Sequence, residues 1–536
     1  MPVKRHTDAQ IAAAYNDVER YPDIASAAAA LGYSPGNFRR HVARLRGKLP
    51  LVDRRALYQG DTRTSVPPDR RVRRWLLTAA QDDTPLHVAF WANLQAYAEA
   101  IGAEILVGGF TYQKGLFEDH ASRTAVFPAE VRPYLQHDNI QCGPLLFAAK
   151  MNILPTAVRP LSGLETYSRG AWAVFPHAKV QLVSVPALPG SRPAQVMTTG
   201  ACTLPNYIEK KAGLKAEFHH QIGATIVEVD ECDRIFCRQI GAVGDGSFQD
   251  LDAMVSGGTV TYGHRVEAIT WGDVHREQLD PVVAMTCWGF DVDTEQVVTD
   301  DSMVAALRPY HQFWHDLLDF RARNHHRRGD HVHAKLMQVL QTERVDDELA
   351  ACARFLRATK REDGRSVVVA SNHTDALLRW LRETDPRGDP VNMMTWCELN
   401  LEWHRRIERE DSDFDLFRFA VSRHDPMGLS DIVFVPRNGT YQICQDKGGI
   451  ECGSHGDEGP NGARGSILNL NRVSIRMTVG HGHSPGILDG VHMVGLCGKL
   501  LQGYNSGASG WAHTQSVAYA NSRRTLVTVW DGKWRA

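Results

Sequence analysis

The hydrophobic and polar positions follow three different patterns along the chain, and each pattern predicts a separate unit. Residues 8–48 repeat apolar side chains at helical spacing, and residues 76–107 read as a strand, a helix and a second strand. After residue 264, short apolar runs end in polar clusters. The sequence therefore predicts a mixed α/β (α+β) protein with a helical start. Its expected units are 1–55, a linker at 56–74, an α/β domain at 75–263 and a larger domain at 264–536.

The first unit has the sequence pattern of a helix-turn-helix. Two helices are expected within residues 8–31, and Ser34 followed by Pro35 is a typical start for a third. The apolar side chains expected to face inward from that third helix are Phe38, Val42 and Leu45. The pattern resembles the DNA-binding modules of bacterial and phage regulators. The alternative is a packing or dimerisation module whose basic face is only solvated. The expected DNA contacts are Asn37, Arg40 and Arg44.

The linker and the middle domain carry no clear chemistry. Residues 56–74 are rich in proline and arginine, which predicts a flexible connection. A strand near 76–80, a helix near 90–101 and a strand near 103–107 then form a βαβ unit. The role of this domain stays open. Its further expected strands are 171–175, 179–185, 195–198, 223–229 and 234–237.

In the last domain, polar clusters follow the ends of short apolar runs, where side chains gather at the edge of a sheet. A β-branched run at 473–479, for example, predicts a strand that leads into two histidines. Carboxylate, amide and imidazole groups together suit Mn²⁺, Fe or Zn²⁺ better than Mg²⁺. One cluster alone would be explained by core hydrogen bonds, but five predict a metal site. The clusters are Asp273 with His275, His315 to Asp319, Asn372 with His373, His455, and His481 with His483.

Composition narrows the class of protein. The 536 residues are 43% hydrophobic and 23% charged, and 60 Lys and Arg against 62 Asp and Glu give a formal charge of -2. Global charge therefore does not indicate a nucleic-acid partner, and no apolar run approaches the roughly 20 residues that span a bilayer. We expect a cytoplasmic protein with no membrane partner. The ten cysteines include no Cys-x-x-Cys pair, which argues against structural zinc, whereas 24 histidines favour metal chemistry.

The order of the clusters resembles the calcineurin-like metallophosphoesterase superfamily over residues 272–483. Residues 480–483, Gly-His-Gly-His, match the last family motif fully, and residues 272–275, Gly-Asp-Val-His, match the first well. Two departures are His315, where the family usually has glycine, and the absence of a carboxylate directly after His373. The resemblance implies a two-sheet β-sandwich flanked by helices. It also implies two divalent metal ions about 3.5–4 Å apart, with Mn²⁺ as the first choice and Fe or Zn²⁺ as alternatives.

The resemblance implies a role for each ligand. One metal would be held by Asp273, His275, Asp316 and His483. The other would be held by Asp316, Asn372, His455 and His481. A bridging hydroxide would attack phosphorus in line, while His373 stabilises the transition state or protonates the leaving oxygen. Asp316, chosen over Asp319 as the bridging residue, and His373 are therefore the expected catalytic residues.

Local features favour DNA as the substrate. A DNA-binding module raises the local concentration of a polymeric substrate. The arginines near the centre either contact phosphates or form a solvated face, and the glycines around Arg464 fit a close approach to phosphate or a plain tight loop. The layout resembles phage-encoded nucleases that degrade DNA, so we expect a metal-dependent DNA nuclease in the cytoplasm of a bacterial host, with self-assembly into a homo-oligomer left open. One alternative is a phosphatase or phosphodiesterase of nucleotides or small phosphoesters. Another is a DNA-binding regulatory or host-takeover protein with a weakly active metal site. The phosphate-binding candidates are Arg321, Arg323 and Arg464.

Overall fold

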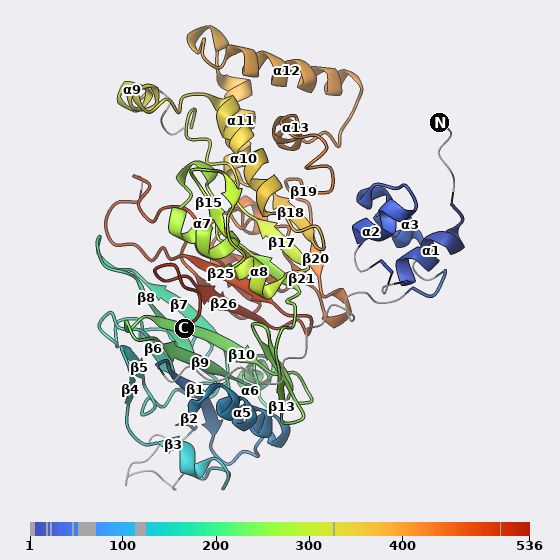
Figure 1. Ribbon diagram of the computed structural model, residues 1–536. Coiled ribbons are helices and arrows are strands. Elements are labelled where there is room, and N and C mark those ends of the chain that lie inside the picture. Colours follow the sequence, from blue (N-terminus) through green and yellow to red (C-terminus); the bar gives the residue numbers. More distant parts are fainter. Residues whose placement is uncertain are drawn as a thin grey trace.

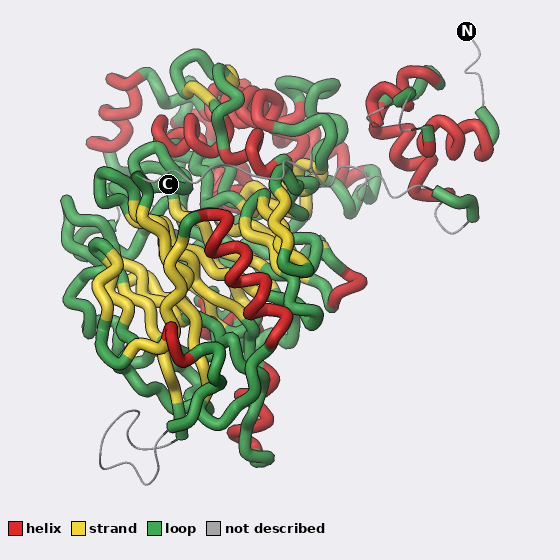
Figure 2. Tube along the Cα trace, turned by 60° about the horizontal axis from the view of Figure 1, so that its bottom comes forward, coloured by secondary structure: helices red, strands yellow, loops and turns green. Residues whose placement is uncertain are grey.

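The computed structural model has a mixed α/β fold, as the sequence predicts. It describes residues 6–17, 20–21, 24–45, 48–51, 71–112, 125–324, 327, 329–503 and 505–536. In both views a small helical unit stands apart from a main body whose strands lie in the middle (Figures 1 and 2). No helix within the described ranges is long and apolar enough to cross a membrane.

The helical unit has the expected three helices and the expected core. They are α1 (Asp8–Asn16), α2 (Ile24–Ala30) and α3 (Pro35–Leu45). Phe38, Val42 and Leu45 on α3 are buried, at 0%, 4% and 1% exposure, which confirms the predicted inward face. Most of the predicted linker, residues 56–70, lies outside the described residues, and its last two residues belong instead to the first strand of the main body.

A five-stranded sheet begins the main body and contains the predicted βαβ unit. Strand β1 (Arg73–Gln81) pairs parallel with β2 (Ala103–Phe110), and α5 (Val88–Ile101) connects them. Apolar side chains of α5, such as Phe90 and Leu94, pack on this sheet in a buried cluster. The strand order is β10-β9-β1-β2-β3, with β9 (Gly223–Val229), β10 (Ile235–Gly241) and β3 (Leu135–Gln136). A small sheet follows, made of β11 (Phe248–Asp250), β12 (Ala253–Ser256) and β13 (Thr259–Thr261).

A six-stranded sheet lies between a layer of helices and a second large sheet. Its side chains alternate: Trp314 and Val368 join the core beneath the helices, whereas Phe313 and Val367 face the second sheet. The strand order is β19-β18-β17-β14-β25-β26, with β19 (Val433–Val435), β18 (Arg365–Val369), β17 (His311–Trp314), β14 (Ala268–Thr270), β25 (Thr514–Ala518) and β26 (Arg524–Thr528). The packed helices are α7 (Pro281–Trp288), α8 (Met303–Leu307), α10 (Val345–Thr359), α11 (Asn372–Glu383), α12 (Met393–Glu408) and α13 (Leu416–Ser422).

The second large sheet has ten strands and draws them from both the middle and the last predicted domain. Strand β7 (Gln181–Val185) pairs antiparallel with β23 (Gly486–Leu488). The predicted division at residue 263 therefore does not separate two sheets. The other strands are β20 (Gln442–Ile443), β21 (Ile450–Glu451), β22 (Met477–Val479), β24 (Val491–Met493), β8 (Ala194–Thr198), β6 (Ala173–Phe175), β5 (Leu145–Phe147) and β4 (Ile140–Cys142).

One predicted strand is much shorter than its apolar run suggests. The pattern predicts a strand over 473–479, but β22 covers only Met477–Val479. The amide of Val473 donates to the carbonyl of Leu470 at the end of α14 (Ile467–Leu470), so the chain is still turning there. Ladder pairing with β21 and β24 begins at Met477, and just before it the carbonyl of Arg476 accepts a hydrogen bond from the amide of Glu451 on β21.

The β7–β23 pair generates a stability prediction. Ile487 is 1% exposed and lies opposite Leu182, in a core shared by both predicted domains. Ile487→Ala should lower the free energy of unfolding by about 2–5 kcal/mol, because a cavity replaces the lost methyl groups. Urea unfolding followed by tryptophan fluorescence measures the loss. Leu501→Ala is the matched control, because Leu501 is 66% exposed. Equal stability of the two variants would contradict the shared core.

Candidate metal centre

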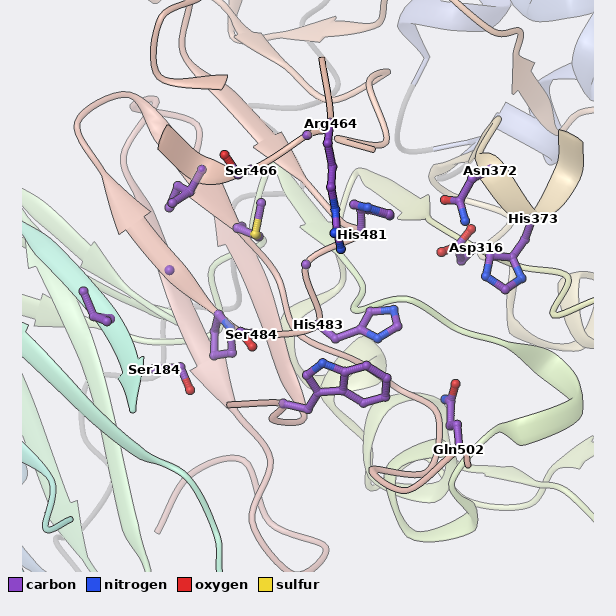
Figure 3. A pocket seen from close by; sticks show the side chains of 18 of the residues that line it. Ser184, Asp316, Asn372, His373, Arg464, Ser466, His481, His483, Ser484 and Gln502 are labelled. Atoms are coloured by element: carbon purple, nitrogen blue, oxygen red, sulfur yellow. The ribbon is translucent and has the colours of Figure 1, made fainter. Parts of the chain in front are cut away.

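The predicted ligands meet where strands of the two large sheets end. Strands β14, β17 and β18 run parallel in adjacent positions, so their carboxyl ends share one edge. Asp273 and His275 follow β14, and Asp316 follows β17. In the facing sheet, β21 and β22 are also parallel, and His455 and His481 follow them. Figure 3 shows Asp316, Asn372 and His373 on one side of a cavity and His481 and His483 beside them.

One group contains the four residues expected to hold the first metal. Ligand atoms of Asp273, His275, Asp316 and His483 all lie within 4.8 Å of one another, and all four residues are buried. Nε2 of His483 is 2.9 Å from Oδ2 of Asp273 and 3.2 Å from Nε2 of His275. Oδ1 of Asp273 and Oδ1 of Asp316 are buried without a hydrogen-bond partner among the described residues. Buried oxygens normally have such partners, so this group is suited to hold a metal ion.

A second group lies on the other side of Asp316. Nε2 of His455 is 3.1 Å from Oδ2 of Asp316 and 3.1 Å from Oδ1 of Asn372. The same oxygen of Asp316 is 3.7 Å from Nε2 of His275, so this carboxylate lies between the two groups. The ring of His481 is 5.4 Å from that of His455, centroid to centroid. The structure therefore brings all seven predicted ligands to one place.

The backbone at four of these residues is held in an uncommon conformation. The φ angles are 44° at His275, 42° at Asp316, 67° at His481 and 51° at His483, all in the left-handed region. Residues with a side chain adopt this region rarely, and such strain persists only where the surroundings fix it. One fixing contact is the 2.7 Å hydrogen bond from the amide of His275 to the carbonyl of Asp316. These four are among nineteen described non-glycine residues with a positive φ, and they are gathered in one cluster.

The carboxylates and imidazoles of the site shift one another's pKa values. Burial lowers the pKa of His275, but the carboxylates of Asp319 and Asp316 outweigh it and raise that pKa to about 9. Burial also lowers the pKa of His455, and Asp316 outweighs it in the same way, again to about 9. Burial raises the pKa of Asp316, but His455 and His373 hold it well below its usual range. Protonated imidazoles thus supply the positive charge that a bound cation would supply instead.

Two supporting residues were not chosen as ligands from the sequence. Oδ1 of Asp319 is 3.0 Å from Nδ1 of His275, a contact that orients the ring so that Nε2 faces the cluster. Nδ1 of His315 is 3.3 Å from Nδ1 of His455, and Nε2 of His315 is buried without a described partner. Asp273, His315 and His455 form a further group of potential ligands. The sequence feature that could have identified both residues is that His315 and Asp319 belong to the same polar cluster as Asp316.

Three of the residues predicted to contact DNA lie in the amino-terminal helical unit. Asn37, Arg40 and Arg44 are exposed on α3, and Arg44 also pairs with Asp8 at 3.2 Å. Contact of this face with DNA stays a prediction.

The arginines near the centre divide into two kinds. Arg323 makes two 2.6 Å hydrogen bonds to the carboxylate of Asp389, so its guanidinium is occupied within the fold. Arg321 and Arg464 instead line the cavity, and Figure 3 shows Arg464 reaching toward His481. The cavity has a volume of about 1270 Å³ and also touches Asp316 and His483. It is therefore continuous with the candidate metal site.

The fold and the site define a mixed α/β protein with a buried His/Asp cluster that could hold metal ions. The chain is 36% identical over 481 residues to "Protein A1" of Escherichia phage T5, covering 87% of this chain and 83% of that protein. It therefore belongs to the family of this phage protein. No family model matches the chain. No solved structure matches it either.

The close packing at Gly480 generates a test of the site. A Cβ atom at this position would lie 2.2 Å from Oδ1 of Asp273 and 3.0 Å from Cβ of His315. Gly480→Ala should therefore displace Asp273 and weaken Mn²⁺ binding by at least about tenfold. Calorimetric titration with Mn²⁺ measures the change.

The matched control is Gly388→Ala, because a Cβ there meets nothing within 4 Å. Unchanged Mn²⁺ affinity in Gly480→Ala, with the fold intact by circular dichroism, would contradict a metal site at Asp273.

Proposed function

We propose that this protein is a calcineurin-like metallophosphoesterase that hydrolyses phosphodiester bonds in DNA. The observation that carries the proposal is the position of Asp316 between two groups of buried ligands, 3.1 Å from His455 and 3.7 Å from His275. These groups follow strand ends of two packed sheets, an arrangement that supports the two-sheet sandwich expected for this family. Mixed imidazole and carboxylate ligation favours Mn²⁺, with Fe or Zn²⁺ as alternatives.

The chain's own residues would have distinct tasks in this reaction. Two bound cations would supply Lewis-acid stabilisation of charge on the phosphoryl oxygens. Asp273, His275, Asp316 and His483 would hold one cation, and Asp316, Asn372 and His455, with His481, would hold the other. Nδ1 of His373 donates to the carbonyl of Asp319 at 2.8 Å, which leaves Nε2 to bind a phosphoryl oxygen or protonate the leaving oxygen. His373 lines the cavity, so that nitrogen is within reach of a substrate.

Three observations support DNA as the substrate. The third helix of the amino-terminal unit has a buried apolar face and exposes Asn37, Arg40 and Arg44. The cavity of about 1270 Å³ is larger than the roughly 300–1,000 Å³ of most small-molecule sites. The similar protein "Protein A1" comes from Escherichia phage T5, and a phage origin fits action on DNA inside a bacterial host. These features favour a polymeric substrate over a small phosphoester.

Plasmid cleavage tests the proposal. The protein with Mn²⁺ should cut plasmid DNA, and EDTA should abolish cutting. Asp316→Asn should lower the rate by at least about a hundredfold, because the carboxylate between the two ligand groups loses its charge. Gel electrophoresis of the plasmid follows the reaction.

Arg387→Gln is the control variant, because Arg387 is exposed and pairs only with Asp385 among the described residues. Hydrolysis of bis(p-nitrophenyl) phosphate without DNA cleavage would favour a small-molecule phosphodiesterase instead. Absence of both activities would favour a DNA-binding regulator.

A further inference from the structure

The cavity beside the ligand cluster has walls from distant parts of the chain. Arg159, Ser162 and Ser184 come from the middle of the sequence, and Arg464 and Trp511 come from its end. The β7–β23 pair joins these walls, because Ser184 lies on β7 and the adjacent β23 lines the same space. Figure 3 shows Ser184, Arg464 and Gln502 around the cavity, with His481 and His483 at its centre. A ligand longer than one phosphate group would therefore contact both regions.

Arginine side chains dominate the charge of this cavity. Apart from Asp316 and Asp319 of the cluster, the described lining carries four arginines and a single carboxylate, that of Glu165. The guanidinium groups of Arg159, Arg321 and Arg464 make no hydrogen bond or ion pair with any residue that the structure describes. The cavity therefore offers three available cations to an anionic ligand.

Two nearby arginines, Arg323 and Arg437, differ from these three because their guanidinium groups are paired with carboxylates. Arg323 is bonded to Asp389, and Arg437 is paired with Asp375 at 3.2 Å and with Asp457. Guanidinium groups that stabilise the fold in this region thus already have carboxylate partners. The three available arginines of the cavity match the pattern expected for phosphate ligands.

Apolar side chains share the cavity with these arginines. Leu336 and Leu468 line the cavity and are 45% and 47% exposed. Trp511 also lines the space, and its ring packs edge-on against His483 with centroids 4.3 Å apart. A duplex keeps the faces of its bases stacked inside and presents mainly phosphates and groove edges. Apolar surface beside phosphate-binding groups suits the unstacked bases of a single strand.

We propose that this cavity binds a single strand of DNA across the catalytic centre, with Arg159, Arg321 and Arg464 on its phosphates and apolar walls on its bases. The inference deepens the proposed function and rests on it. Strand binding would also assign a role to the middle domain, because Arg159 would contact the substrate beyond the bond that is cut. A duplex would then need a nick, a frayed end or local opening before cleavage.

Fluorescence anisotropy tests strand binding separately from catalysis. The full chain in EDTA is titrated into labelled oligonucleotides of about 12 nucleotides, within the range that single-strand-binding domains cover. One probe is single-stranded, one has the same phosphates but abasic sites, and one is a duplex. The single strand should bind at least about fivefold more tightly than the abasic probe, because base contacts are lost.

Variants locate the binding surface. Arg159→Gln, Arg321→Gln and Arg464→Gln should each weaken single-strand binding about five- to tenfold at low salt. Each should also lower the slope of log affinity against log salt by about 0.7. Arg387→Gln, outside the cavity, should change neither quantity. Thermal unfolding of each variant checks that the fold is intact.

Unchanged single-strand affinity in all three variants would overturn the proposal, even if plasmid cleavage persists. An equal loss of duplex affinity in these variants would also overturn it, because the cavity would then take a duplex. If affinity falls as expected but no phosphodiester is hydrolysed, strand binding is supported and the proposed catalytic function fails.

Discussion

The fold around this site depends on the cost of burying two carboxylates. Asp273 and Asp316 are 0% and 1% exposed, and a buried carboxylate without compensating charge is strongly unfavourable. Compensation comes from the imidazoles of His275 and His455, whose pKa values the carboxylates raise, and from the 2.9 Å contact of His483 with Asp273. The segments that carry these residues meet where the ends of parallel strands from the two large sheets face each other. The ligand cluster therefore requires both large sheets to pack as they do.

The same constraint explains why the middle of the chain belongs to the site. Strand β22 leads into His481 and His483, and β24 and β23 continue its sheet toward β7. Anchoring β23 against β7 fixes the loop between β22 and β23, in which both histidines lie. Strand β7 thus holds β23, which follows the ligand loop, and residues of β7 also form a wall of the cavity.

Short sequence patterns were enough to predict the ligand residues at strand ends and the buried face of a helix. Polar residues directly after apolar runs indicated Asp273, Asp316 and His483, because a strand end places such side chains at the sheet edge. Helical spacing likewise predicted the buried side chains of Phe38 and Val42.

Long-range pairing could not be predicted in the same way. The β7–β23 pair joins residues about 300 positions apart, and neither strand's sequence specifies its partner. The pairing of Arg323 with Asp389 was hidden for the same reason, since a basic run looks alike whether it binds phosphate or a distant carboxylate. The strand at 473–479 was overpredicted, because β-branched residues favour extended structure even where the chain still turns after α14.

The most direct test of a two-metal centre around Asp316 is a crystal structure of the protein grown with Mn²⁺, with anomalous scattering recorded above the manganese edge. We expect two anomalous peaks, one beside Asp273, His275 and His483 and the other beside Asn372 and His455, with Asp316 between them. An ordered cluster with no anomalous peak near Asp316 would contradict the account.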